Sequence, residues 1–221
     1  YTGEDTLSLH DALPISIPVT GTFYYDIISP FSYFYVKQRH RFNKRVDIEP
    51  VPILLGGLFR ATDNRGPGEV EAKRPHTYQY CVWLADKLGL PFRFPNHHPF
   101  LTVAAQRLLV QQDARWEMVE RAFEFVWVEG KDPNLSWPQF CQYLGLAADT
   151  PKPDAPEIKA KLISNTEKAK ADGAFGVPTL VIHGHAFWGV DTIDWALDYL
   201  DRPDMFEQAA YRHASQLPSG L

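Results

Sequence analysis

The 221-residue sequence predicts an α/β fold in which a β-α-β unit and a β-β-α unit are separated by a helical block. Apolar runs rich in β-branched and aromatic residues occupy residues 19–28 and 46–53, on either side of an aromatic helical segment. Two further β-rich runs occupy 178–183 and 185–188, and residues 70–173 follow helical spacing. Neither two-stranded half can bury its own face, so both are expected to join one sheet. This order is that of a thioredoxin-like fold interrupted by an all-helical insertion.

The first half of the fold depends on the junction between the first strand and the helix that follows it. Ser29 is expected to begin that helix, because Pro30 would then lie in the first turn, where its missing N–H costs nothing. The helix continues to Phe42, and residues 46–53 form the second strand. A strand–helix–strand unit of this length favours a parallel pair with a right-handed crossover. Residues 54–68 contain four glycines and are expected to form a loop.

The helical block shows its periodicity most clearly in one apolar stripe. Its members recur at i, i+3, i+7 and i+10: Trp116, Val119, Phe123 and Val126. Ser136 to Gln139 resembles a capping box that begins another helix. A proline-rich break precedes a charged helix at 157–171.

The second half of the fold is predicted to be a β-hairpin followed by a helix. Gly184 supplies a short turn between the strands at 178–183 and 185–188. Residues 193–200 form a final amphipathic helix, and the chain from Arg202 onward is polar and expected to be mobile.

These elements divide the chain into four parts. The thioredoxin-like domain comprises 18–68 and 174–202, the helical insertion domain 69–173, the C-terminal tail 203–221, and a non-native N-terminal extension 1–17. The extension is set apart because residues 6–16 resemble the translation of a sequencing adapter. A signal peptide is the rival interpretation, but charged residues interrupt any apolar run there.

Composition excludes several classes of function. The net charge is -5 and there is no basic run, which disfavours nucleic-acid binding and electrostatic membrane anchoring. No apolar run approaches the ~20 residues of a membrane span. Cys81 and Cys141 are far apart on helical segments, so both are expected to be reduced, in a cytoplasmic protein.

No cofactor site other than the strand–helix junction is expected. The histidine pairs at 97–98 and 183–185 lack a third ligand or are separated by a turn, so no metal site is predicted. The tryptophans of the helical block are assigned to the core or an interface. The absence of a glycine-rich phosphate motif predicts no nucleotide.

Several segments in register carry a resemblance to a known family. The segments are 23–33 (FYYDIISPFSY), 54–59 (LLGGLF), 64–67 (NRGP), 90–95 (LPFRFP), 173–179 (GAFGVPT) and 188–191 (WGVD). Together they resemble 2-hydroxychromene-2-carboxylate isomerases, bacterial enzymes of aromatic compound catabolism that are related to kappa-class glutathione transferases and to DsbA-like proteins. The resemblance implies a thioredoxin-like fold, glutathione as cofactor and a homodimer.

The resemblance assigns Ser29 as the catalytic residue, which hydrogen-bonds the glutathione sulfur. Redox relatives carry Cys-x-x-Cys at this junction, whereas this chain has hydroxyls at Ser29 and Ser32, so the sulfur must come from outside. A hydroxyl donor at the positive end of a helix favours a thiolate. Considered alone, Ser29 is better explained as an ordinary N-cap, and only its register with Pro178 favours the sulfur site.

The same resemblance places further glutathione contacts at Pro30, Phe31, Val177, Pro178, Val190 and Asp191. A cis bond before Pro178 would expose the Val177 backbone to pair with the ligand like an added strand. An ordinary strand-entry proline is the alternative. Asp191 would hold the ligand's α-ammonium group, or else serve as a plain N-cap. Relatives usually have a polar residue in place of Val190 and often arginine in place of Thr192.

Substrate contacts are assigned by resemblance to Asn64, Lys73 and Trp188. Lys73 would reach a substrate carboxylate or a developing enolate. Its alternative interpretation is a solvated surface charge beside Glu69, Glu71 and Arg74.

The resemblance thus implies a glutathione-dependent isomerase acting on a small aromatic carboxylate by reversible thiolate addition. A kappa-class-like glutathione transferase is the first alternative, because the site would be the same and only the fate of the adduct would differ. A DsbA-like protein without redox activity is the second, and a non-catalytic binding module on the same fold is the third.

Overall fold

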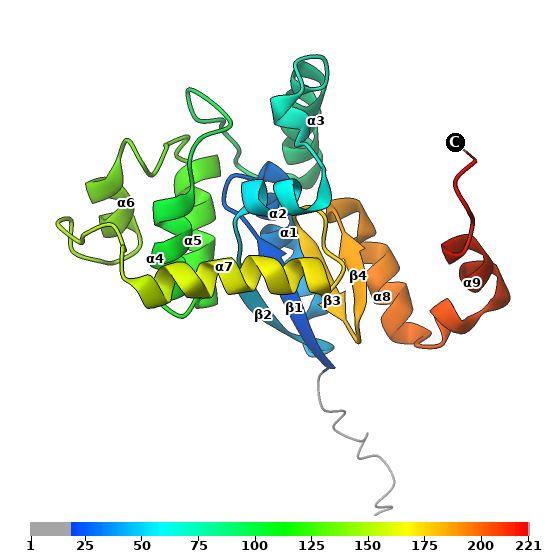
Figure 1. Ribbon diagram of the computed structural model, residues 1–221. Helices are drawn as coiled ribbons and strands as arrows, with labels where there is room; N and C mark the ends of the chain where they lie inside the picture. The colour runs from blue at the N-terminus through cyan, green and yellow to red at the C-terminus, as the bar shows by residue number, and fades with distance from the viewer. Residues whose placement is uncertain (1–18, 221) are drawn as a thin grey trace, which may run out of the picture.

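The structure is a computed structural model that describes residues 19–220, so the prediction for residues 1–17 lies outside the described residues. Four strands and nine α-helices lie in this part of the chain (Figure 1). The strands are β1 (Val19–Tyr25), β2 (Val46–Pro52), β3 (Thr179–Ile182) and β4 (His185–Trp188). The helices are α1 (Pro30–Gln38), α2 (Leu55–Thr62), α3 (Arg74–Leu88), α4 (Val103–Gln111), α5 (Trp116–Trp127), α6 (Trp137–Tyr143), α7 (Pro156–Ala171), α8 (Ile193–Asp201) and α9 (Ala209–Ser215).

The two predicted halves meet in one mixed sheet of order β2-β1-β3-β4. β1 runs parallel to β2, with Val19 opposite Val46, and antiparallel to β3, with Tyr24 opposite Thr179. β3 and β4 form the predicted hairpin, and its two-residue turn at His183 and Gly184 has positive φ at both positions. The thioredoxin-like order interrupted by helices is therefore confirmed.

Side-chain alternation along β1 divides the sheet into two buried faces. Phe23 and Tyr25 point into a large core shared with α1, α5 and α8, which extends without a break into the helical block. Tyr24 points the other way, into a smaller cluster with Leu58 of α2 and Ala169 of α7. Helices on both faces bury the sheet, and α2 and α7 lie on the face turned to the viewer in Figure 1.

The prediction of a loop at 54–68 is wrong, because residues Leu55–Thr62 form α2. Two glycines lower helix propensity, but tertiary contacts override that cost. Leu58 is fully buried against the sheet. The Leu54 N–H donates to Thr166 Oγ1 of α7 at 3.0 Å.

The chain beyond Arg202 is also more structured than predicted. A 3-10 turn at Met205–Glu207 precedes α9. Met205 is fully buried, and the ring of Phe206 stacks on His185 with centroids 4.3 Å apart. The two adjacent apolar side chains anchor a segment whose overall composition is polar.

One predicted boundary and one predicted helix cap also need correction. The first strand ends at Tyr25 rather than at residue 28, because the carbonyls of Ile27 and Ile28 bind side chains from the helical block. The helix after Ser136 begins as predicted, but the Ser136 side chain makes no capping hydrogen bond. Trp137 anchors that helix instead, since it is buried and its Nε1–H donates to Thr150 O at 2.7 Å. Both cysteines are free and buried in helices, as predicted.

Candidate functional site

Ser29 lies at the junction of β1 and α1, as the N-cap of α1. Its backbone is extended, with φ -90 and ψ 116, as expected for a residue before proline. Its Oγ accepts a hydrogen bond from the Ser32 N–H at 3.2 Å, and Pro30 occupies the first turn. No acidic side chain lies in that turn, so the positive end of the helix is not neutralised locally.

The segment before β3 lies directly against Ser29. The Ser29 Oγ–H donates to Val177 O at 3.4 Å, near the long limit for a hydrogen bond, and Ser29 is only 6% exposed. The Val177–Pro178 peptide bond is cis. The Gly189 N–H donates to Pro178 O at 2.9 Å and so joins the end of β4 to the same place. Three chain segments distant in sequence therefore meet beside one hydroxyl group.

Asp191 lies in a 3-10 turn, Val190–Thr192, that packs against α1. It is not the N-cap of the helix that follows, because α8 begins after Thr192, which is its N-cap residue. Its carboxylate is exposed and lies over Gly189, where any β-carbon would collide with Oδ1. Gly189 also has a φ of +97, so both the backbone conformation and the lack of space for a β-carbon require glycine at this position. Val190 is partly buried next to the main core.

Asn64 and Trp188 both contact the segment that leads into Val177. Asn64 Nδ2–H donates to Phe175 O at 3.1 Å. The rings of Phe175 and Trp188 lie 4.9 Å apart, and both are about half exposed. Gly176 allows this packing, because a side chain there would collide with the Trp188 indole. These two predicted residues therefore border the Val177 side of the site.

Phe31 faces α3, and Lys73 is the N-cap residue of that helix. Phe31 faces Tyr80 with ring centroids 6.2 Å apart, and Tyr80 in turn stacks on Trp83. Lys73 is exposed just before α3. Within residues 19–220 its ammonium group makes no hydrogen bond or ion pair, and no contact joins it to Ser29, Val177 or Asp191. The structure thus groups all the other predicted residues but leaves Lys73 apart.

Sequence reasoning missed a buried carboxylate that organises the loop before Ser29. Asp26 Oδ1 accepts from the Ile28 N–H at 3.1 Å, and Oδ2 accepts from the Leu55 N–H at 3.0 Å and from Thr102 Oγ1–H at 3.2 Å. Burial raises the pKa of Asp26 to about 6, despite these three hydrogen bonds that lower it. A charged residue at the end of a buried strand was the available signal.

Two rings of the helical block were also missed as parts of the site. Trp127 Nε1–H donates to Ile27 O at 2.9 Å, and His98 Nε2 lies 2.8 Å from Ile28 O. The sequence assigned Trp127 to the core and set His98 aside as a possible metal ligand. No local pattern reveals that these rings reach a loop 70 and 100 positions away.

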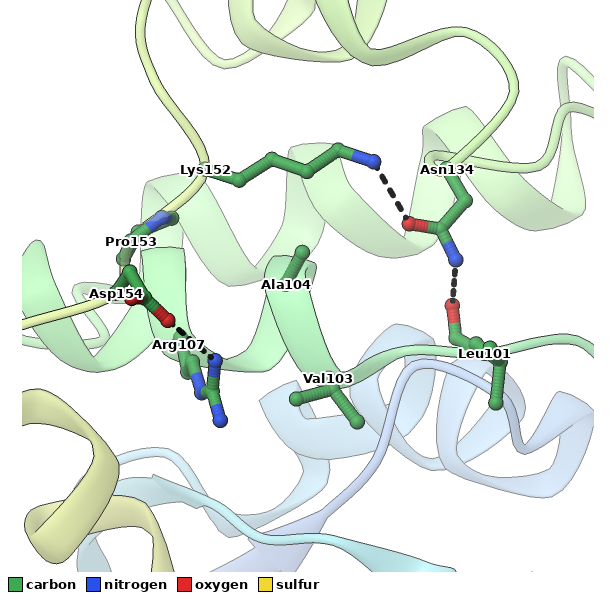
Figure 2. Close-up of a pocket in the computed structure, with 8 residues that line it drawn as sticks. All are labelled: Leu101, Val103, Ala104, Arg107, Asn134, Lys152, Pro153 and Asp154. Atoms are coloured by element: carbon green, nitrogen blue, oxygen red, sulfur yellow. Dashed lines mark hydrogen bonds and ion pairs between the residues drawn. The ribbon is translucent and has the colours of Figure 1, made fainter.

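A cavity of about 330 Å³ lies elsewhere, between α4 and the 134 and 152–154 segments (Figure 2). Several of its polar groups are paired: Lys152 Nζ–H donates to Asn134 Oδ1, and Arg107 Nη1 faces Asp154 at 3.6 Å, whereas Arg107 Nε has no partner within the described residues. None of the predicted site residues lines it. This cavity is therefore separate from the Ser29 site.

Residues 19–220 contain neither a membrane-spanning helix nor a cluster of metal-ligand side chains. No helix there combines the length and apolarity needed to cross a bilayer. No group of three or more histidine, cysteine, aspartate or glutamate side chains is placed to hold a metal ion in that part of the chain.

Comparison with known proteins places this chain in a family. Glutathione S-transferase kappa 2 of Caenorhabditis elegans is 27% identical over 205 residues, which cover 82% of this chain and 91% of that protein. The 2-hydroxychromene-2-carboxylate isomerase of Sphingobium xenophagum is 28% identical over 194 residues, 82% of this chain and 97% of that protein. A solved structure of a 2-hydroxychromene-2-carboxylate isomerase shares the fold, with a TM-score of 0.70 at 20% identity, over 90% of this chain and 100% of that one.

The family assignment follows from a match along most of the chain. Residues 22–201 match the family model described as DSBA-like thioredoxin domain. They include all four strands except the first residues of β1, and all but the last helix. The chain belongs to the DSBA-like thioredoxin domain family.

Proposed function

We propose that the Ser29 site holds the thiolate of glutathione and that the protein is a glutathione-dependent isomerase of the 2-hydroxychromene-2-carboxylate type. The observation that carries the proposal is a hydroxyl group at the N-terminus of α1, whose first turn holds no acidic side chain, beside the Val177 carbonyl, where redox relatives keep a cysteine. Positions 29 and 32 both carry serine, so the sulfur at this site must come from a bound molecule.

The groups around Ser29 fit a sulfur anion. The hydroxyl proton of Ser29 makes only a long hydrogen bond to Val177 O, so the hydroxyl group can rotate toward a stronger acceptor. The Ser32 N–H is already bound to Ser29 Oγ and Pro30 has no N–H, which leaves the Phe31 N–H as the first-turn donor for a ligand. An ordinary thiol has a pKa of ~8.5, and lowering it by ~2 units requires ~2.7 kcal/mol of preferential thiolate binding. A hydroxyl donor and a helix end together supply energies of this order.

The remaining contacts follow from the segments that meet at Ser29. The backbone of Val177 would pair with the peptide part of glutathione. The exposed Asp191 carboxylate would bind the α-ammonium group, and the Val190 N–H would serve in place of the polar side chain of relatives. Phe31 and Trp188 offer aromatic surfaces on the two sides of Ser29.

Bound glutathione would supply a nucleophile that adds reversibly to a conjugated carbon–carbon double bond, so that the substrate can rotate about it before the sulfur leaves. The residues of this chain would stabilise charge during that reaction. Ser29 would hold the sulfur when it is anionic, and the free ammonium group of Lys73 would hold the substrate carboxylate. A small aromatic carboxylate would use the ring surfaces of Phe175 and Trp188.

A kappa-class-like glutathione transferase is an equally supported alternative, because the kappa transferase of C. elegans is similar over nearly the same length of chain. The same site would then release a stable conjugate. A DsbA-like redox reaction requires a sulfur at position 29 or 32 and is not proposed. We further propose a homodimer in a reducing cytoplasm, which suits two free cysteines and reduced glutathione.

The test compares two reactions of one purified protein. A 2-hydroxychromene-2-carboxylate and an aryl halide are each assayed with and without glutathione. Glutathione-dependent isomerisation without net thiol consumption supports the isomerase, whereas conjugation of the halide alone supports the transferase. Activity on neither substrate, or full activity without glutathione, refutes the proposal.

Lys73 provides a further discrimination within this test. Lys73→Gln should raise the KM for the carboxylate substrate several-fold and leave the reaction with the neutral aryl halide unchanged. Lys87, which is also exposed on the α3 side of the molecule, provides the matched control as Lys87→Gln. Equal effects of both variants would remove Lys73 from the site.

A further inference from the structure

The loop that carries Ser29 is held in place by side chains from the helical block. Between Asp26 and Ser29, the carbonyl of Ile27 accepts from Trp127 Nε1–H, and the carbonyl of Ile28 binds His98 Nε2. The Ile28 N–H donates to Asp26 Oδ1, and the Ser29 N–H donates to Asp26 O. Four hydrogen bonds within the chain therefore hold the backbone on the N-terminal side of α1.

Of the two side chains from the helical block, His98 contacts the residue nearest to Ser29, because it binds the carbonyl of Ile28. A carbonyl oxygen can only accept, so His98 Nε2 carries a proton that it donates to Ile28 O. The other ring nitrogen, Nδ1, lies 2.6 Å from the Tyr78 hydroxyl of α3, which also lies 2.9 Å from His98 O. Burial is the main cause that lowers the pKa of His98, so the neutral ring with Nε2–H is the stable form near neutral pH.

The bond to His98 decides where the Ile28 carbonyl points. Ile28 is the residue immediately before the N-cap, and its carbonyl carries partial negative charge. Without the imidazole donor, this carbonyl would need another partner, because an unpaired carbonyl in a partly buried loop is costly. Two donors lie within three residues of Ile28 along the chain, at the start of α1: the Phe31 N–H and the Ser29 hydroxyl group. These are the same donors that a sulfur anion would use.

We propose that His98, held by Tyr78, is a positioning residue that keeps the Ile28 carbonyl away from the first turn of α1 and so reserves that turn's donors for an anion at Ser29. This inference deepens the proposed function, since the anion there would be the glutathione sulfur. The inference depends on contacts within this chain, so it can be tested without glutathione and separately from the proposed function.

The test places a reporter thiol in the site with Ser29→Cys, which makes glutathione unnecessary. The pKa of the introduced thiol is measured from the pH dependence of its alkylation by iodoacetamide. Mass spectrometry distinguishes it from Cys81 and Cys141, both of which are buried and free. The S29C protein is then compared with the double variants S29C/H98F, S29C/H98N and S29C/H98Q.

The three His98 substitutions separate positioning from packing. Gln places an amide N–H close to the position of Nε2 and should keep the bond to Ile28 O, whereas Asn reaches only the position of Nδ1 and Phe has no donor. We expect H98F and H98N to raise the pKa of the introduced thiol by about one pH unit, and H98Q to leave it within a few tenths of a unit. If H98F fails to fold, H98N against H98Q makes the same comparison.

A purely structural role for His98 predicts a different result. H98F and H98N would then lower the melting temperature while the thiol pKa stayed at the S29C value, and that outcome would overturn the proposal. Equal shifts in H98N and H98Q would do the same. Failure of the wild-type protein to bind glutathione would refute the proposed function but would leave this comparison valid.

Discussion

Ser29 uses its hydroxyl group in two ways, and they make different demands on the side chain. As an acceptor it caps α1 through the Ser32 N–H, and as a donor it faces Val177 O across 3.4 Å. The acceptor bond stabilises the helix, whereas the donor is the group that a sulfur anion would recruit. The two uses can be separated by substitution, because Ser32 lies in the same turn but makes no such contacts through its own hydroxyl.

Ser29→Ala should lower kcat/KM with glutathione by about 10- to 100-fold, which corresponds to the loss of one charge-assisted hydrogen bond. It should also lower the free energy of unfolding by about 1 kcal/mol through the lost cap. Ser32→Ala is the matched control. Its hydroxyl is buried without a partner in the described part of the chain, so the variant should keep full activity and stability. Equal losses in the two variants would contradict a specific role for Ser29.

Asp26 makes stability depend on pH in a direction opposite to that of a typical ion-paired carboxylate. Its folded-state pKa is raised from 3.8 to about 6, so the folded protein binds this proton more tightly than the unfolded chain. The contribution of Asp26 is therefore fully present below about pH 4 and is lost as the pH rises through about 6.

Urea unfolding of the wild type and Asp26→Asn at several pH values measures this contribution. The wild type should lose about 2–3 kcal/mol relative to D26N between pH 4 and pH 7. Above pH 7 the difference between the two proteins should be constant. A difference that does not change with pH would show that Asp26 titrates normally in the folded state.

At the scale of elements, the C-terminal segment is part of the fold rather than an appendage. Met205 is fully buried, and Phe206 packs among the rings of His185, Phe187 and Tyr199, which belong to β4 and α8. These contacts cover the β4 side of the sheet. The polar composition of the segment gave no sign of these contacts, because the two apolar side chains Met205 and Phe206 are enough to anchor a short turn.

Met205→Ala should therefore lower the free energy of unfolding by about 2–4 kcal/mol, the usual cost of truncating a fully buried side chain. Leu217→Ala, at a side chain that is 63% exposed, is the control and should change stability by less than about 0.5 kcal/mol. Chemical denaturation measures both. A neutral Met205→Ala would mean that the segment detaches in solution.

At the scale of the whole molecule, local patterns identified most elements, while long-range contacts decided the rest. The two strand pairs, the α1 junction at Ser29 and the hairpin turn at Gly184 were all predictable, because each has its own turn residues or periodicity. Helix α2 was not, because its stability comes from Leu58 packing on the sheet and α7 rather than from its own glycine-containing sequence.

The residues of the candidate site also fall into those that local motifs predict and those that only long-range contacts reveal. Motifs located Ser29, Val177 and Asp191, and the topology brought their segments together. The support from His98 and Trp127 could not be predicted, since it crosses between the helical block and the thioredoxin-like part. The helical block thus does more than cover the sheet: it fixes the loop on which the proposed chemistry depends.

The pKa of the thiol group of bound glutathione tests the central claim most directly. It is measured by thiolate absorbance in the ultraviolet as the pH is varied, with wild type and Ser29→Ala each saturated with glutathione. The account predicts a pKa about 2 units below the ~8.5 of a free thiol in the wild type, and a value about one unit or more higher in S29A. An unshifted thiol in the wild type, or identical values in the two proteins, would contradict it.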